Sequence, residues 1–301
     1  MAQPGQCVNV GGWPIPRKHA FFLLLLYNLS AGWLKIQVFH GLGVLQMKVA
    51  IVTGGGGGIG RATALALADL DYALVLAGRT PGRLEEVAEQ IKRAAGRAIC
   101  VPTDVTKPQE VDRLVRYATE EFSRIDALIN TAGIAPMIPT ADIMPDQWRE
   151  ILEVNLSAAF YLTRAIWPVF RSQHLESQAN LHEQGRSGTE LASDSGGVIV
   201  HISSESSRDP FPGLGAYGVA KVALNMLTKV TAQEGEPLGI RVVGIAPAAV
   251  ETPMFRALMT NEQVPTRDIL APYDVAEAVV GAVTGAMRYA SGETIFIHRR
   301  I

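Results

Sequence analysis

The sequence predicts an α/β fold with one doubly wound parallel sheet of about seven strands in a single domain. Short, continuously apolar segments recur along the chain, and amphipathic segments of helical length separate them. Continuously apolar strands are typical of a sheet that is covered on both faces, which requires parallel strands joined by helices. We therefore expect each strand to be followed by a helix that packs on the sheet.

The expected strands begin directly after Met47 and are, in chain order, 48–53, 73–78, 98–103, 125–130, 197–202, 240–246 and 294–298. The expected helices are 61–70, 82–96, 110–122, about 146–171, the segment around Tyr217, and one that starts at about 272. Segment 172–195 contains no aromatic residue and few apolar ones, so we expect an exposed, partly disordered polar insertion. His174 and His182 lie in it without a neighbouring cysteine, so we expect solvated side chains and no metal site.

Residues 1–46 form an atypical leader. Three basic or partly basic residues at 17–19 precede an apolar run over 20–34, which is shorter than the roughly 20 residues that a spanning helix needs. Three interpretations remain open: a signal peptide or membrane anchor, an organelle-targeting leader, or an extension upstream of the functional start. Met47 favours the last, and with it a cytoplasmic protein. The alternative is membrane contact through residues 1–46.

Composition excludes several classes of protein. The chain has 301 residues, of which 48 % are hydrophobic and 19 % charged, with a net charge of −2. This balance is ordinary for a globular enzyme and lacks the basic excess of a nucleic-acid-binding protein. The two cysteines, Cys7 and Cys100, do not indicate a disulfide framework.

A glycine-rich segment, "VTGGGGGIGRA" at 52–62, joins the first expected strand to the first expected helix. Glycine permits a tight turn and lets backbone N–H groups approach a pyrophosphate at the positive end of the helix. The register is ambiguous, because the run fits both G-x-G-x-x-G and T-G-x-x-x-G-x-G. In this position between strand and helix, either register indicates nucleotide binding.

The end of the second expected strand indicates which dinucleotide is bound. An acidic residue about 20 positions after the glycine segment would favour NAD through the ribose hydroxyls. Gly78 and Arg79 stand there instead. A guanidinium matches a 2′-phosphate in charge and geometry, so NADP(H) is predicted over NAD(H).

Tyr217 and Lys221 are four residues apart in "GLGAYGVAKVAL" at 213–224. On a helix these positions share one face. A phenol of pKa about 10 is a weak acid at neutral pH, and a nearby ammonium would lower its pKa. The pair is therefore a candidate acid–base device.

These segments together resemble the short-chain dehydrogenase/reductase family, from about residue 48 to near the C-terminus. The residues that match the family's motifs are Thr53, Gly54, Gly58 and Gly60 in the glycine segment, Asp104, Asn155, Ser204, Tyr217 and Lys221. The chain departs from the family pattern in "NTAG" at 130–133, in Ala248 where the family has glycine, and at its C-terminus. None of these departures removes a catalytic group.

The resemblance implies a Rossmann-type catalytic domain over 47–301 that transfers hydride between NADP(H) and a carbonyl or secondary alcohol. Tyr217 would act as general acid or base, Lys221 would lower its pKa, Ser204 would hydrogen-bond the oxyanion, and Asn155 would position a water. Ser203 competes with Ser204, and the spacing selects Ser204. The implied cofactor contacts are Thr53, Gly54, Gly58, Ile59, Gly60, Arg79, Asp104, Val105, Asn130, Ala132, Gly133, Tyr217, Lys221, Pro247, Val250 and Thr252.

The resemblance further implies a homodimer or homotetramer and a small-molecule substrate. In this family the segment at 254–274 shapes the substrate site; here Phe255, Leu258 and Met259 offer an apolar lining, and Arg256 or Arg267 a contact for an anion. A 3-oxoacyl thioester fits the overall pattern, while sugars, steroids and quinones stay open. Two alternatives remain: a membrane-anchored reductase of lipids or sterols, and a dinucleotide-binding regulatory protein without turnover.

Overall fold

The computed structural model describes residues 8–10, 13–15, 47–183 and 196–299. Contacts divide the chain into two units, Met1–Gln46 and Met47–Ile301. In the first unit, β1 (Val8–Val10) pairs antiparallel with β2 (Trp13–Ile15), a pairing that the sequence did not predict. The apolar run at 20–34 lies outside the described residues.

The second unit contains one seven-stranded sheet in the order β5-β4-β3-β6-β7-β8-β9, and every pairing in it is parallel. Its strands are β3 (Val49–Thr53), β4 (Ala73–Gly78), β5 (Ala98–Pro102), β6 (Ala127–Asn130), β7 (Gly197–Ile202), β8 (Ile240–Pro247) and β9 (Thr294–Ile297). The predicted α/β fold, with a doubly wound parallel sheet in a single domain, is confirmed.

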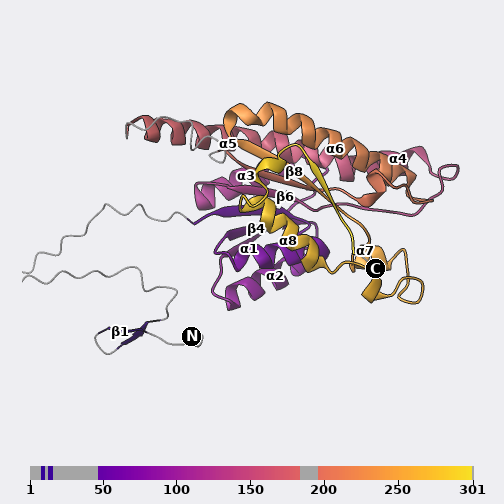
Figure 1. The fold of residues 1–301 in the computed structure, drawn as a ribbon, viewed down its shortest axis with the longest axis horizontal. Helices are drawn as coiled ribbons and strands as arrows, with labels where there is room; N and C mark the ends of the chain where they lie inside the picture. The colour runs from indigo at the N-terminus through magenta and orange to yellow at the C-terminus, as the bar shows by residue number, and fades with distance from the viewer. Residues whose placement is uncertain (1–7, 11–12, 16–46, 184–195, 300–301) are drawn as a thin grey trace, which may run out of the picture. The chain divides into compact units, whose positions relative to one another are not determined.

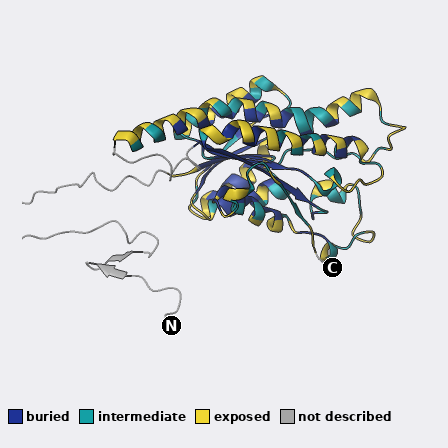
Figure 2. Ribbon diagram, turned by 45° about the horizontal axis from the view of Figure 1, so that its top comes forward, coloured by how far each residue is buried: buried dark blue, intermediate teal, exposed yellow. Residues whose placement is uncertain are grey.

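Helices cover both faces of this sheet (Figure 1). Those on one face are α1 (Gly58–Ala68), α2 (Pro81–Arg93) and α8 (Pro272–Val283), and those on the other include α3 (Pro108–Phe122), α5 (Ala158–Glu183) and α6 (Gly215–Gly235). Each face has its own core. Leu67, Leu84 and Val279 pack against one side, and Leu114, Leu162 and Phe170 against the other. Figure 2 shows the consequence: the central strands of the sheet are buried, and the helices are buried mainly where they face the sheet.

The strand order reverses between β3 and β6, which lie side by side at the centre. Loops that leave the carboxyl ends of these two strands run in opposite directions and leave a crevice between them. The glycine-rich segment follows β3 and residues 131–134 follow β6, so the topology brings them together at this edge.

The prediction for segment 172–195 is wrong over its first half. α5 continues to Glu183, so residues 172–183 are helical, while 184–195 lie outside the described residues. The segment has no glycine or proline before Gly185, and Gln173 ties it to the sheet through hydrogen bonds with the backbone N–H and C=O of Ile125. His174 is buried, contrary to expectation, whereas His182 is exposed.

The remaining elements are α4 (Pro145–Leu152), α7 (Pro253–Arg256), the π-helical segment Glu153–Ser157 and short 3₁₀ turns at Glu205–Ser207, Glu236–Leu238, Thr266–Asp268 and Arg288–Ala290. None of the helices in the described part of the chain has both the length and the apolar character that a membrane span requires.

Candidate active site

Two adjoining cavities lie at the carboxyl edge of the sheet. The glycine cavity, of about 340 Å³, is lined by the turn after β3, the end of β4 and the turn after β5. The tyrosine cavity, of about 380 Å³, is lined by residues from α6, from the ends of β7 and β8 and from the segment after β8. Ile59, Gly133 and Thr252 line both. The two cavities therefore share part of their walls, and one elongated ligand could extend from one to the other.

The turn between β3 and α1 is built for a close backbone approach. Gly54 and Gly58 have φ angles of +64° and +49°, which side chains rarely adopt. A Cβ on Gly60 would lie 2.3 Å from the Gly54 carbonyl oxygen. This packing directs the N-terminus of α1, whose first turn carries no acidic residue, toward the glycine cavity. The geometry matches a pyrophosphate site.

Thr53 and Asn130 lie beneath this turn, and neither is among the residues that line the two cavities. The Thr53 hydroxyl is 3.2 Å from the Asn130 Oδ1, and it accepts hydrogen bonds from the backbone N–H groups of Thr131 and Ala132. These contacts join the turn after β3 to the turn after β6. Both residues thus hold the cavity wall in place, and Ala132 and Gly133 form the wall itself.

The lining of the glycine cavity also includes two arginines, Arg79 and Arg83, together with Asp104 and Val105. Asp104 Oδ1 accepts hydrogen bonds from the Thr106 hydroxyl at 2.7 Å and from its backbone N–H at 3.1 Å. Burial works to raise the pKa of Asp104, but these hydrogen bonds and the charges of Lys107 and Arg79 outweigh it and lower the pKa. A carboxylate that is fixed in this way stays ionised beside the arginines.

Asn155 reaches the tyrosine cavity from the π-helical segment Glu153–Ser157. Its Nδ2 donates to the carbonyl oxygens of Ile134 at 2.8 Å and Ile151 at 2.9 Å. A Cβ on Gly133 would lie 2.8 Å from the Asn155 Oδ1. Only glycine therefore lets the turn after β6 pack on this amide. Wide helical turns of this kind are common at functional sites.

Tyr217 and Lys221 lie on α6, as predicted, and both line the tyrosine cavity. A Cβ on Gly218 would be 3.0 Å from the Ser206 carbonyl oxygen, so a small residue here lets α6 approach the turn after β7. Lys221 is only 4 % exposed, and its Nζ donates to the Ile202 carbonyl at 2.8 Å. The Nζ lies 5.5 Å from the centroid of the Tyr217 ring.

Burial dominates the protonation of this pair. It lowers the pKa of Lys221 to about 7 and raises the pKa of Tyr217, against a hydrogen bond with Ser204 that acts in the lowering direction. Burial thus sets the direction of the Tyr217 pKa in this structure, and the lowering effect expected of Lys221 stays a prediction. A lysine whose own charge is depleted by desolvation near neutral pH attracts a phenolate only weakly.

Ser204 lies at the start of the turn Glu205–Ser207, and its Oγ accepts a hydrogen bond from the Ser206 backbone N–H at 3.2 Å. Pro247, Val250 and Thr252 line the opposite wall of the tyrosine cavity. Thr252 caps α7, since its hydroxyl accepts from the Phe255 backbone N–H at 3.2 Å. All four expected catalytic residues are thus brought to one cavity.

His201 on β7 is a buried polar residue that sequence analysis did not single out. It is fully buried, and neither ring nitrogen has a hydrogen-bond partner among the residues that the structure describes. Burial, and secondarily the charge of Lys221, lowers its pKa to about 3. His201 is therefore neutral at physiological pH.

Sequence reasoning also missed several residues that line the two cavities: Arg83, Met137, Glu205, Asp209, Phe211 and Leu214. The position of Arg83, four residues after Arg79 at the start of a helix, was a usable signal. The others lie on turns whose path depends on tertiary packing, so no pattern in the chain marked them.

Comparisons with known proteins agree with this architecture. Residues 54–299 match a family model described as enoyl-(acyl carrier protein) reductase. An uncharacterized oxidoreductase from Staphylococcus aureus strain MRSA252 is 32 % identical over 241 residues, which cover 80 % of this chain and 93 % of that protein. A second, from Listeria monocytogenes, is 33 % identical and covers 72 % and 80 %.

Among solved structures, a 3-ketoacyl-(acyl-carrier-protein) reductase from Brucella melitensis, complexed with NADH, superposes with a TM-score of 0.73. It is 27 % identical in sequence, and the match covers 83 % of this chain and 96 % of that protein.

Proposed function

The chain belongs to the short-chain dehydrogenase/reductase family, and from this premise we propose that it interconverts a carbonyl compound and a secondary alcohol with NADP(H). One observation carries the proposal: Asn155, Ser204, Tyr217 and Lys221 line a single cavity that adjoins the glycine cavity. A protein that only bound a dinucleotide would need the glycine cavity, but it would not need these four side chains in the tyrosine cavity.

The residues of the glycine cavity fit a dinucleotide. The turn after β3 offers backbone N–H groups and the positive end of α1 to a pyrophosphate. Arg79 and Arg83 add two positive charges to the lining of the same cavity. These charges support NADP(H), because a guanidinium binds a 2′-phosphate through paired, charge-assisted hydrogen bonds.

When bound, the cofactor supplies hydride for reduction and accepts it in oxidation. In reduction, the Ser204 hydroxyl would donate a hydrogen bond to the substrate oxygen as negative charge develops on it. Tyr217 would then give its phenolic proton to that oxygen. The raised pKa of Tyr217 suits this step, since the phenol is protonated at neutral pH.

In oxidation the same phenol must first lose its proton, so the oxidation rate should rise with pH above neutrality. Lys221 would help by stabilising the phenolate once both groups are enclosed with the ligand. Asn155, which is anchored to Ile134 and Ile151, would hold a water beside Lys221 for proton exchange.

The direct test is to incubate the purified protein with NADPH and a panel of ketones and aldehydes, and to follow absorbance at 340 nm. Turnover should occur with at least one carbonyl class, and Tyr217→Phe should remove nearly all of it while cofactor binding is kept. Turnover in Tyr217→Phe within a few-fold of the original protein would refute the acid–base role.

We also propose that the protein is a homo-oligomer in the cytoplasm. An apolar stripe along α6 supports self-association: Val219, Val222, Met226 and Val230 share one helix face and are all exposed. Sedimentation velocity should show a dimer or tetramer. Met226→Glu combined with Val222→Lys should shift the protein toward monomer without changing its circular dichroism.

A further inference from the structure

We infer that the tyrosine cavity takes a neutral, predominantly apolar ketone or secondary alcohol whose reacting oxygen is its one polar function, and that it disfavours sugars and anionic compounds. The inference rests on the proposed function for the reaction at that oxygen. It goes beyond that function by naming the chemical class of the substrate.

One apolar wall of the cavity comes from two loops that are far apart in the chain. Met137 follows β6, whereas Phe211 and Leu214 precede α6. The Ile138 backbone N–H donates to the Gly213 carbonyl at 2.8 Å, and a Cβ on Gly213 would lie 2.7 Å from the Met137 Cγ. These contacts hold the two loops together, so their apolar side chains meet at the same wall.

The segment after β8 supplies a second apolar wall. Its first part is helical, since the Met259 backbone N–H donates to the Phe255 carbonyl at 2.9 Å. Positions one and four apart on a helical turn share one face. The side chains that this segment contributes to the lining follow that spacing up to position 259: Met254, Phe255, Leu258, Met259 and Val264.

The apolar lining extends to the surface of the protein. Phe211 is 46 % exposed, Met254 41 % and Met137 38 %. Large apolar side chains that stay exposed around a cavity are typical of a binding site for an apolar ligand. A hydrocarbon chain or ring would cover them, and removal of both surfaces from water would favour binding.

Most polar side chains of the lining are already bonded within the protein. The Asn155 amide donates to two backbone carbonyls, and the Lys221 Nζ donates to a third. The hydroxyls of Thr131 and Thr252 also donate to backbone carbonyls. These groups would have to give up protein partners before they could bind a ligand.

The Ser204 hydroxyl and the Tyr217 phenol are both assigned to the reacting oxygen under the proposed function. A sugar would bring several further hydroxyl groups into the cavity. Each hydroxyl that loses water without gaining a partner weakens binding. A substrate with a single oxygen avoids this cost.

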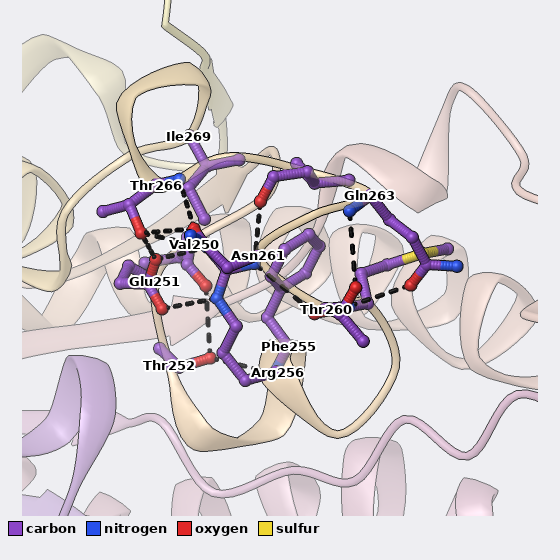
Figure 3. Close-up of polar contacts among 12 residues, drawn as sticks. Val250, Glu251, Thr252, Phe255, Arg256, Thr260, Asn261, Gln263, Thr266 and Ile269 are labelled. Carbon is purple, nitrogen blue, oxygen red and sulfur yellow. Dashed lines mark hydrogen bonds and ion pairs between the residues drawn. The ribbon is translucent and has the colours of Figure 1, made fainter.

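The basic residues of this region do not offer a site for an anion. Lys221 is the one basic residue in the described lining, and it is buried and bonded to the backbone. Arg256 is bound to Glu251, whose Oε1 accepts from the Arg256 Nε at 2.7 Å (Figure 3). Neither Arg256 nor Arg267 lines the cavity, so the anion contact expected from sequence is not formed in its described part.

Glu205 and Asp209 are the other charged residues of the described lining, and both are acidic. Glu205 is paired with Arg208, whose Nη2 lies 2.8 Å from the Glu205 Oε1, and Asp209 is exposed. Both carboxylates would repel a carboxylate or phosphate on a substrate. The lining as a whole therefore favours a neutral substrate.

The test measures how the rate depends on apolar length and on polarity. The full-length protein is assayed with NADPH and three methyl ketones: 2-butanone, 2-hexanone and 2-octanone. We expect kcat/KM to rise about tenfold for each two added methylene groups, because each buries more apolar surface. Two analogues of the same chain length as 2-octanone, 7-oxooctanoate and 8-hydroxy-2-octanone, should have a kcat/KM at least about tenfold lower than 2-octanone.

Leu258→Asn, a change of similar size that makes the second wall polar, should reduce the ratio of kcat/KM for 2-octanone to that for 2-butanone at least about fivefold. Because the ratio is measured within one variant, a general loss of activity cancels. The matched control is Leu175→Asn, the same change at an exposed position on α5 outside both cavities, which should keep the original ratio. All five ketones are also tested for stabilisation of the protein with NADP⁺ in thermal melts.

A kcat/KM that does not depend on chain length, an equal or higher value for 7-oxooctanoate, or a ratio that Leu258→Asn leaves unchanged would overturn the inference while the proposed function stands. If no ketone is reduced, but stabilisation rises with chain length and Leu258→Asn removes that rise, the proposed function fails and the inference about the cavity holds. Absence of both turnover and stabilisation overturns the inference.

Discussion

Ser203 and Ser204 are neighbours in the chain, but their hydroxyl groups contact different parts of the structure. Ser203 is buried, and its Oγ is 2.5 Å from the Asn225 Oδ1 within the packing of α6 on β7. Ser204 Oγ instead contacts the Ser206 backbone and the Tyr217 phenol. Successive residues at the end of a strand point to opposite sides, which explains the division.

This division predicts opposite effects of two matched substitutions. Ser204→Ala should lower kcat about 100-fold or more, because it removes a donor to the developing oxyanion. Ser203→Ala should instead reduce the free energy of unfolding by about 1–2 kcal/mol, because Asn225 loses a buried partner. Steady-state kinetics and urea denaturation on both variants separate the two roles. A larger loss of kcat in Ser203→Ala than in Ser204→Ala would reverse the assignment.

Arg79 and Arg83 should determine cofactor preference. The original protein should bind NADPH more tightly than NADH by about 1–3 kcal/mol, the scale of charge-assisted hydrogen bonds. Arg79→Ala should remove most of that difference, Arg83→Ala part of it, and Gly78→Asp in addition should turn the preference toward NADH. Fluorescence titration of both cofactors measures this. The prediction fails if the original protein binds both with equal affinity.

His201 should make the protein sensitive to acid. Its pKa is about 3 in the folded protein and about 6.5 when unfolded, so the unfolded state binds more protons between these values. Stability is therefore lost as the pH falls through this window. Between pH 7 and pH 5 this residue should cost about 2 kcal/mol of unfolding free energy.

His201→Gln should lose correspondingly less stability over the same interval, measured by urea denaturation at both pH values. His182→Gln, which changes an exposed histidine on α5, is the control and should behave as the original protein. A parallel fall in all three proteins would show that other groups cause the acid sensitivity.

Glu251 and Arg256 should keep the apolar wall of the tyrosine cavity in place. Arg256 also donates a hydrogen bond to the Val264 carbonyl, and Glu251 accepts one from the Thr266 hydroxyl at 2.7 Å (Figure 3). The pair therefore connects the start of the loop after β8 to residues 264–266. Arg256→Met should reduce kcat/KM about tenfold through a higher KM, because the loop loses its preorganisation. NADPH affinity should not change. Glu251→Gln, which keeps one acceptor, should have a smaller effect, and equal effects on KM and on NADPH affinity would contradict this role.

A chain that begins at Met47 should fold and keep full activity. β3 begins at Val49, and among the residues that the structure describes, those of the seven strands, both cores and both cavities all follow position 46. Circular dichroism, size-exclusion chromatography and the NADPH assay would test this. Aggregation or loss of cofactor binding would show that residues 1–46 contribute to the core. Partition of the full-length protein into membranes would instead support the anchor.

The alternation of apolar strands with amphipathic helices was sufficient to predict the sheet. Burial on both faces requires continuously apolar strands, and this pattern is visible in the local sequence without knowledge of the tertiary contacts. The polar segment 172–183 was misread for the same reason. Its pattern is polar, yet its residues are good helix formers and Gln173 and His174 pack against the body of the protein. Local polarity did not reveal that the helix continues.

The sequence by itself determined the fold and the glycine turn, since each depends on a pattern along the chain. The four residues of the candidate catalytic set were predicted from their match to the motifs of the short-chain dehydrogenase/reductase family. Only the tertiary structure decided the electrostatics of the site. The sequence predicts Lys221 to be an ammonium beside Tyr217, but packing of α6 against the sheet buries it and lowers its own pKa to about 7. Arg256 reads as a contact for an anion, but Glu251, five residues earlier, binds it. Desolvation and charge pairing depend on which groups lie close in space, and the order of residues in the sequence does not give the distances between those groups.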